Sequence, residues 1–247
     1  VVERLREELS RPGYRCEPIA LGINTDAYQP AEHRLGLTRG ILALALEFRQ
    51  PVALITKSAL VLRDRDLLAA LAERNLVRVS VSLTTLDDEL KRRLEPRTAG
   101  PAGRLKVLRT LARDGVPVGA MVAPVIPRIN DAELEAIVEA VAEAGARSAS
   151  YILLRLPHEV APLFEDWLEA HYPLRRSAVM NAIRSCQGGQ VYDATFHQRM
   201  RGRGLIADMI ARRFAVARRR FGLDRSLGEL DSSAFRSPAT AQKDLFA

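Results

Sequence analysis

The stretch VRVSVSLTTLD, residues 77–87, alternates valine with arginine and serine before it ends in two threonines and an aspartate. So short a run of β-branched residues predicts a strand over Val77–Leu83, which we expect to be buried on both faces. Four further apolar runs have the same length and character, at Ile19–Ile23, Val52–Thr56, Val116–Val122 and Ser150–Leu154. These strands are the framework of the predicted fold.

Amphipathic stretches separate the runs and predict helices over Leu35–Phe48, Arg65–Glu73, Arg104–Arg113 and Ala132–Ala144. Alternating strands and helices are typical of parallel βαβ units, in an open sheet or a barrel. Leu5–Leu9 is also predicted to be helical. Because parallel α/β folds seldom begin with a helix, and because this chain begins with Val rather than Met, we expect one further strand upstream of Val1.

Beyond Pro157 the pattern becomes purely helical, with helices predicted over Val160–His171, Ser177–Ser185 and Ile206–Phe221. The sequence therefore predicts an α/β partial barrel over residues 1–157 and a basic helical extension over residues 158–223. Residues 224–247 are polar and lack periodicity, which predicts a disordered tail.

The composition is that of a folded chain with one sizeable core. Of 247 residues, 47% are hydrophobic and 27% are charged, which excludes wholesale disorder. No apolar run reaches the roughly 20 residues of a membrane span, and the first residues do not resemble a signal peptide. Two cysteines are too few for a disulfide framework, so we expect a cytoplasmic protein without a membrane partner.

The net charge of +7 is concentrated in one segment. The window Arg199–Arg220 contains eight arginines and a single acid, Asp208. Such a segment is suited to contact nucleic-acid phosphates, with an affinity that falls as salt rises. A solvated helix face is the alternative interpretation of the same arginines.

Each predicted strand ends in hydrogen-bonding or charged residues. The segments concerned are Asn24–Pro30, Thr56–Ser58, Ser80–Thr85, Ala123–Asp131 and Arg155–Glu159. Because ligands bind at the carboxyl ends of parallel strands, the sequence predicts a ligand site at this face.

Six segments carry a family resemblance: GINTDAYQP (residues 22–30), ITKSALVLRD (55–64), VSVSLTTLD (79–87), LEPR (94–97), MVAPVIPRIND (121–131) and YILLRLPHEV (151–160). In this order they resemble radical S-adenosylmethionine (SAM) proteins related to spore photoproduct lyase, a group described as DNA repair photolyase-like. The resemblance implies an incomplete (β/α)6 TIM-like barrel that binds SAM and a [4Fe–4S] cluster. It also implies a lyase-like enzyme that receives an electron from a donor such as flavodoxin or ferredoxin. The enzyme would cleave SAM to a 5′-deoxyadenosyl radical and abstract hydrogen from its substrate.

The chain departs from this family in one large respect. The cluster of the family is held by three cysteines in a C-x-x-x-C-x-x-C loop, and that loop is absent here. Cys16 and Cys186 each lack a partner at this spacing. We therefore expect no metal ligand in this chain, cluster cysteines upstream of Val1, and no activity from the chain by itself.

The resemblance assigns six residues to SAM, namely Thr25, Asp26, Lys57, Ser82, Pro124 and Asn130. Lys57 would bind the methionyl carboxylate, with Ser82 as a second donor, and the segment from Pro124 to Asn130 would form the adenine pocket. Tyr28, Gln29 and Arg155 are candidates for the substrate side.

Structural interpretations of several of these residues stay open. Asp26 would cap a helix that starts near Ala31, and Asn130-Asp131 would cap the helix that follows it. Lys57 would be a lysine at the barrel rim. Ion pairs would give structural roles to two further pairs of residues, Arg155 with Glu159 and Glu95 with Arg97.

Two other functions are compatible with the same residues. A Schiff-base aldolase on a (β/α) barrel would use Lys57 as its nucleophile. A relative without a cluster would bind nucleic acid through Arg199–Arg220 and would have no affinity for SAM. The upstream sequence distinguishes the enzyme classes, because a three-cysteine loop excludes the aldolase.

Overall fold

The centre of the protein is a five-stranded parallel sheet, seen in a computed structural model that describes residues 1–192 and 200–237. The strands are β1 (Ile19–Leu21), β2 (Val52–Thr56), β3 (Val77–Ser82), β4 (Val118–Val125) and β5 (Ser148–Leu153). Each strand pairs with the next one along the chain. The predicted alternation of strands and helices is confirmed, and the architecture is a partial TIM-like barrel.

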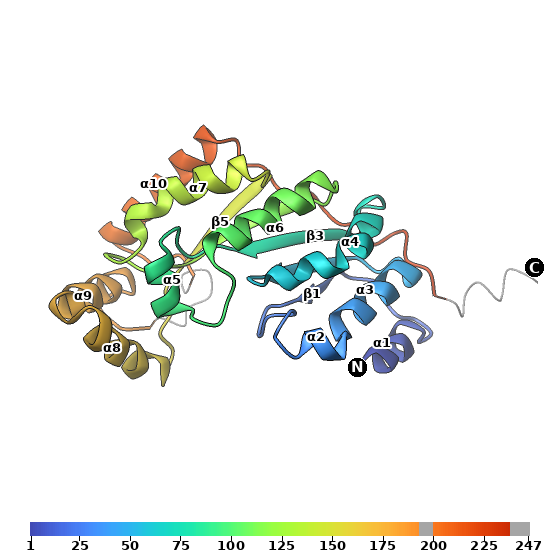
Figure 1. The fold of residues 1–247 in the computed structure, drawn as a ribbon, viewed down its shortest axis with the longest axis horizontal. Coiled ribbons are helices and arrows are strands. Elements are labelled where there is room, and N and C mark those ends of the chain that lie inside the picture. The colour runs from blue at the N-terminus through green and yellow to red at the C-terminus, as the bar shows by residue number, and fades with distance from the viewer. Residues whose placement is uncertain (193–199, 238–247) are drawn as a thin grey trace, which may run out of the picture.

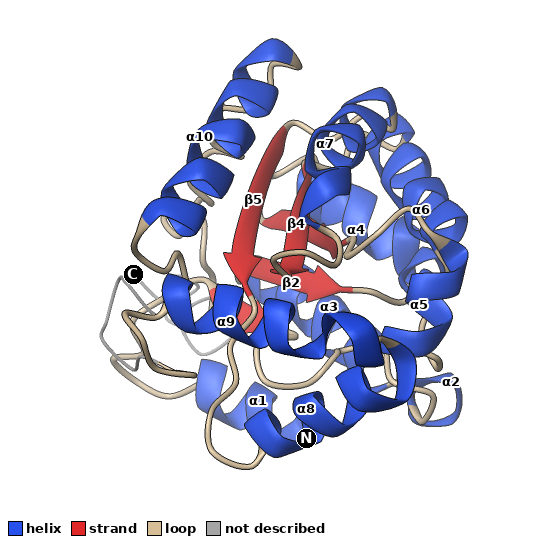
Figure 2. Ribbon diagram, turned by 90° about the vertical axis from the view of Figure 1, so that its left-hand side faces the viewer, coloured by secondary structure: helices blue, strands red, loops and turns tan. Residues whose placement is uncertain are grey.

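Helices cover one side of this sheet (Figure 2). In the barrel they are α1 (Val2–Leu9), α2 (Glu32–Leu35), α3 (Leu37–Phe48), α4 (Arg65–Ala72), α5 (Asp88–Leu94), α6 (Pro101–Arg113) and α7 (Leu134–Glu143), with 3-10 helices η1 (Ala59–Asp64) and η2 (Asp131–Glu133). α4 and α6 contact β3, and α6 and α7 contact β4. Pro101 opens α6 earlier than predicted because proline suits the first helical position, and Gly115 and Gly145 follow α6 and α7 with positive φ.

The C-terminal helices divide into two groups. They are α8 (Val160–His171), α9 (Arg176–Cys186) and α10 (Leu205–Arg220), with the short η3 (Pro173–Arg175) between α8 and α9. α10 packs beside α7 and against β5, so it belongs to the helical layer of the barrel (Figure 1). α8 and α9 form a separate apolar cluster, tied to α5 by a 3.0 Å hydrogen bond from Trp167 Nε1 to the Arg93 carbonyl. Within the described residues, no helix combines the length and apolar character that crossing a bilayer requires.

The two faces of the sheet differ, which corrects the prediction of strands buried on both sides. In β3, Val79 and Val81 are buried beneath the helices, whereas Ser80 between them is only partly buried on the opposite face. β2 and β5 show the same alternation. The helical layer covers only one side, and the small and polar side chains of the other side line open cavities.

Residues 224–237 follow an extended path along the protein, which differs from the disorder predicted for them. The path begins with a bridge between Asp224 and Ser148 at β5. It continues with hydrogen bonds from Arg78 and Asn75 side chains to carbonyls of the tail. Near its end Phe235 packs against the rings of Tyr14 and Phe48. Backbone hydrogen bonds and one aromatic anchor fix this segment, and neither produces a periodic pattern in the sequence.

Gly22 marks a close approach between the end of β1 and β2. Its φ is +86°, and a Cβ atom at this position would lie 2.0 Å from the Ile55 carbonyl oxygen. Only glycine allows the backbone to turn here and leave the following residues at the mouth of the barrel.

Alanine at position 22 should therefore be strongly destabilising. We expect Gly22→Ala to lower the free energy of unfolding by about 3 kcal/mol or more, since it adds a backbone collision to an unfavourable φ. Gly13→Ala is the matched control, because Gly13 has a φ of +81° and nothing within 4 Å of an added Cβ. The control should cost about 1 kcal/mol. Urea unfolding measures both, and equal losses would show that the contact with Ile55 is unimportant.

Candidate functional site

A cavity of about 820 Å³ lies at the carboxyl ends of the strands. All five strands or the loops that follow them contribute to its wall. Six of the residues predicted from the sequence line it, namely Thr25, Asp26, Lys57, Ser82, Pro124 and Arg155. The polar strand ends thus meet at one cavity, as expected for a parallel α/β sheet.

Asp26 joins the end of β1 to the end of β2. Its Oδ1 accepts hydrogen bonds from the Thr56 hydroxyl at 2.7 Å and the Tyr28 amide at 2.9 Å. Its Oδ2 accepts one from the Lys57 amide at 2.8 Å. The side chain does not cap α2, which begins without a side-chain cap, so that interpretation is wrong. Asp26 instead fixes the position of Lys57 relative to the β1 loop.

Lys57 directly follows β2 and forms an ion pair that the sequence did not reveal. Its Nζ lies 2.6 Å from Oε1 of Glu95, and Oε2 of the same carboxylate lies 2.6 Å from Nη2 of Arg104. The Thr84 hydroxyl donates to Oε2 as well, at 3.2 Å. The predicted pair between Glu95 and Arg97 is therefore wrong, since Glu95 is held by Arg104 and Lys57.

Arg104 was not predicted as a site residue, although the sequence contained a signal. It occupies the apolar stripe of α6 with Val107, Leu108 and Leu111, where a charge is costly unless it is paired. Only 2% of Arg104 is exposed. Its guanidinium also donates to the Ser82 carbonyl at 3.1 Å, so it connects the end of β3 to Glu95.

The electrostatics of this cluster keep Glu95 ionised. Burial by itself would raise the pKa of Glu95, but Arg104 and Lys57 outweigh it, and the net pKa lies below the ordinary value. The Lys57 side chain is 37% exposed toward the cavity side of the cluster. An ammonium has three N–H donors, so donors of Lys57 remain for a ligand beyond the one used by Glu95.

Asn130 supports the cavity wall without lining it. The side chain is 2% exposed and accepts from the Ile126 amide at 2.6 Å. Its amide group donates to the carbonyls of Thr84 and Pro124, at 2.8 and 2.9 Å. Asn130 occupies the predicted cap position before η2, but its side chain makes no capping hydrogen bond there. Asn130 holds the turn after β4 against the end of β3.

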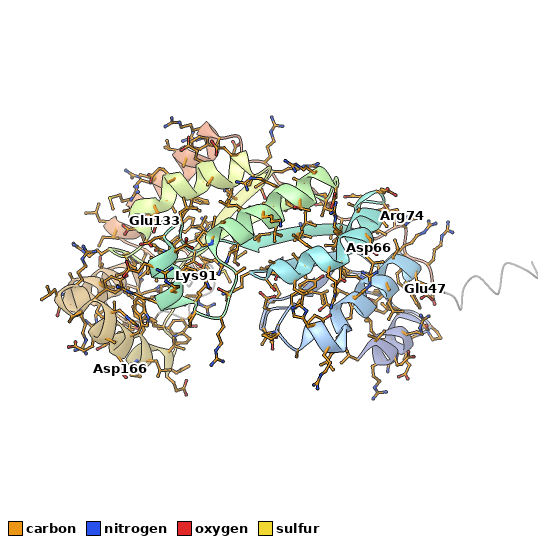
Figure 3. All side chains as sticks on the ribbon, viewed as in Figure 1. Glu47, Asp66, Arg74, Lys91, Glu133 and Asp166 are labelled. Atoms are coloured by element: carbon orange, nitrogen blue, oxygen red, sulfur yellow. The ribbon has the colours of Figure 1, made fainter. Side chains whose placement is uncertain are left out.

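Glu133 provides a similar brace at the start of α7 (Figure 3). Its two carboxylate oxygens accept from the Thr85 hydroxyl at 2.7 Å and the Leu86 amide at 2.8 Å. Because Thr85 and Leu86 lie in the loop after β3, this contact fixes the position of that loop at the edge of the cavity.

The substrate-side candidates occupy different places. Tyr28 and Gln29 line a neighbouring hollow of about 460 Å³ that shares Asp26 and Lys57 with the main cavity. Tyr28 is 3% exposed and donates to Asp64 at 3.1 Å. Burial, helped by the Asp64 carboxylate, raises the pKa of Tyr28 far above its ordinary range, so the phenol stays neutral. Gln29 is exposed.

Arg155 lines the main cavity at the end of β5. Its Nη2 donates to the Tyr192 hydroxyl at 3.1 Å, and the guanidinium lies over the Tyr192 ring. The predicted pair with Glu159 does not form. The Nε of Arg155 is buried without a hydrogen-bond acceptor, which is unusual for a buried donor.

The described residues contain no group of His, Cys, Asp and Glu side chains suited to hold a metal ion. Cys16 precedes β1 and lies 3.5 Å from the Gln50 side-chain oxygen. Cys186 ends α9 within the core that includes Leu153 of β5, and burial raises the pKa of its thiol to about 11. β1 and β5 are opposite edges of the sheet, so the two thiols belong to separate regions.

Comparison with known proteins identifies the family. The model of the radical SAM superfamily matches residues 1–141. The chain belongs to the radical SAM superfamily. An uncharacterized protein of Mycobacterium tuberculosis is 37% identical over 171 residues, which cover 68% of this chain and 50% of that protein. An uncharacterized protein of Methanocaldococcus jannaschii is 29% identical over 157 residues, covering 64% of this chain and 57% of the relative.

This radical SAM chain thus spans about half the length of the curated relatives it matches. Among solved structures it is similar to spore photoproduct lyase complexed with dinucleoside spore photoproduct. The TM-score is 0.56 at 15% identity, over 90% of this chain and 62% of the other. A variant of the same lyase gives a TM-score of 0.57 with the same identity and coverage. At this identity the similarity establishes the shared fold.

Removing the Glu95 charge should destabilise the protein in a pH-dependent way. We expect Glu95→Gln to cost about 3–5 kcal/mol at neutral pH, because it leaves Arg104 buried without its carboxylate. The folded pKa of Glu95 is depressed, so its contribution is complete above the unfolded value of about 4.3 and is lost as the pH falls through the lower folded value.

The difference between the wild type and Glu95→Gln should therefore shrink in acid, which denaturant unfolding across the acidic range measures. Glu89→Gln is the control, because the Glu89 side chain is 60% exposed and its one ion pair within residues 1–192 and 200–237 is with Arg93 on the surface of α5. Its cost should stay below about 0.5 kcal/mol. A pH-independent cost of Glu95→Gln would contradict the proposed ion pair.

Proposed function

We propose that the cavity at the strand ends is the SAM site of a radical SAM enzyme. The observation that carries this proposal is the meeting of the Lys57 ammonium with the Ser82 and Thr25 hydroxyls on one cavity in a chain of this family. When bound beside a reduced [4Fe–4S] cluster, SAM supplies the radical that abstracts hydrogen from a substrate. The electron would come from a donor such as flavodoxin or ferredoxin.

The chemistry of the cavity wall suits SAM, which carries a carboxylate at its methionyl end and an aromatic adenine ring at its adenosyl end. Lys57 would bind the methionyl carboxylate through a donor not used by Glu95, and Ser82 would add a hydroxyl. Met121, Ile152 and Leu154 give the remaining wall its apolar character. The buried Nε of Arg155 provides a donor that still lacks an acceptor, as expected where a ligand completes the hydrogen bonding.

The described residues fit SAM but do not fit the cluster, since they offer no set of thiolates. We propose that cysteines outside this chain hold the cluster in the complete protein. The matched part of this chain covers 50% of the length of the Mycobacterium tuberculosis relative, so that relative has further residues that could include such a segment. What this chain contributes is the carboxylate-binding lysine, its positioning by Glu95 and Asp26, and the wall of the cavity.

The ion pair of Lys57 also argues against the aldolase alternative. A Schiff-base nucleophile needs a free lone pair on nitrogen. The Lys57 nitrogen instead lies 2.6 Å from a carboxylate that is itself held by Arg104. The same contact orients Lys57 for binding an anion.

The proposal is tested with the complete natural protein that contains this chain, reconstituted without oxygen. A [4Fe–4S] absorption and electron paramagnetic resonance signal that changes on addition of SAM, with release of 5′-deoxyadenosine on reduction, is the expected result. Lys57→Gln should weaken SAM binding by about tenfold or more while the cluster signal stays intact. Lys106→Gln, which removes the same charge from the exposed face of α6, should bind SAM normally. A complete protein without a cluster signal would overturn the proposal.

We further propose a nucleic acid as the substrate class. Spore photoproduct lyase, whose fold this chain shares, has been solved with a dinucleoside photoproduct. In α10 the side chains of Arg212, Arg219 and Arg220 are exposed, whereas Arg213 forms a 2.6 Å ion pair with Glu135. Arg199, at the start of the basic window, lies outside the described residues.

Removing two exposed charges from α10 should weaken nucleic-acid binding at low salt. We expect the double variant Arg219→Gln/Arg220→Gln to lower affinity for a fluorescent oligonucleotide by about fivefold and to flatten the salt dependence by roughly one unit of slope per lost contact. The control Arg109→Gln/Lys106→Gln removes the same charge from α6. Equal losses in both variants, measured by fluorescence anisotropy, would indicate a net-charge effect and contradict a site on α10.

A further inference from the structure

A second hollow, of about 410 Å³, lies at the other end of the same open face of the sheet. It shares Ile23 and Ile55 with the SAM-site cavity, so the two hollows are neighbours along the uncovered side of the strands. Its wall combines the sheet, α10 and the tail that follows α10. Apart from Ile23 and Ile55, its lining residues are not part of the proposed SAM site.

The sheet supplies a floor of small hydroxyl side chains. Ser80 of β3, Gly119 of β4 and Ser148 of β5 form one row, because each is in register with the next. A Cβ atom on Gly119 would lie 2.7 Å from Ser148 Oγ and 3.1 Å from Leu227 Cδ1, so the absence of a side chain at Gly119 lets Ser148 and the tail residue Leu227 pack over β4. Ser80, Ser148 and Leu227 all line the hollow.

Three arginines from three segments surround this floor. They are Arg78 of β3, Arg218 of α10 and Arg225 of the tail. Arg78 donates to the Gly228 carbonyl at 3.3 Å and Arg218 to the Leu223 carbonyl at 3.2 Å. Within residues 1–192 and 200–237, none of the three forms an ion pair with a carboxylate.

The hollow is thus rich in cationic donors and lacks a counter-charge of its own. Among the described residues that line it there is no acidic residue, and the neighbouring Asp224, which bridges to Ser148 through its backbone, is not part of the lining. A guanidinium carries five N–H donors, so most donors of the three arginines are not used by the two carbonyl contacts. Three like charges around one hollow repel one another unless an anion joins them.

We propose that this hollow binds a phosphate group, carried by a small phosphate compound or by a nucleic-acid backbone. Phosphate offers several acceptor oxygens and up to two negative charges, which suit the guanidinium groups and the serine hydroxyls that line the hollow. The site lies toward the amino ends of β3 and β5, and neither Lys57 nor Ser82 lines it. Phosphate binding at this hollow can therefore be tested separately from SAM binding.

Isothermal titration calorimetry of the protein with pyrophosphate, without SAM or cluster, tests the site. We expect saturable binding that Arg225→Gln weakens by about tenfold, while Arg225→Lys, which keeps the charge but not the fork, weakens it less. Arg225 is exposed and makes no side-chain hydrogen bond or ion pair within the described residues, so its loss should leave the melting temperature unchanged. Arg109→Gln on α6 is the matched control and should bind pyrophosphate normally.

Competition by short oligothymidylate identifies the source of the phosphate. Displacement of pyrophosphate by the oligonucleotide would place a nucleic-acid backbone in the hollow, and its failure to compete would indicate a small phosphate compound. Both results support the site. The absence of saturable binding by either probe, or equal loss of affinity in Arg225→Gln and Arg109→Gln, would overturn it.

Discussion

The carboxylate of Glu95 is the contact on which the mouth of the barrel depends. It receives the Arg104 guanidinium from α6, the Lys57 ammonium from β2 and the Thr84 hydroxyl beyond β3. A buried charge is tolerated only when it is paired, so each partner fixes the others in place. The carboxylate of Glu95 thereby fixes the direction of Lys57 and links the ends of β2 and β3 to α6 at the edge of the cavity.

Much of the fold could be predicted because local sequence determines it. The Val and Ser alternation of β3, and the turn glycines after α6 and α7, indicate strands and helices without reference to tertiary structure. The cavity could be predicted because parallel strands bring their carboxyl ends together. The family resemblance then indicated which of the polar side chains at the strand ends are candidates for binding SAM.

What the sequence could not reveal are contacts that depend on register and crossover geometry. The sequence predicts a helix cap or a ligand contact for Asp26, whereas its partners Thr56 and Lys57 depend on the pairing of Leu21 with Leu54. The sequence predicts an ion pair of Glu95 with the neighbouring Arg97. In the structure Glu95 pairs instead with Arg104, a residue on the next helix. The tail is predicted to be disordered because an extended segment held by backbone contacts has no periodicity.

That tail has a mechanical consequence for the barrel. Residues 224–237 begin at β5, cross to Arg78 and Asn75 near the start of β3, and finish against Phe48 and Tyr14 beside the opposite edge of the sheet (Figure 1). An incomplete barrel has no closing strand pair to hold its curvature. Here residues 224–237 span the sheet at the amino ends of its strands. Because the strands are stiff, this segment also limits how far their carboxyl ends can move apart. The width of the ligand cavity is in this way set partly from the far end of the molecule.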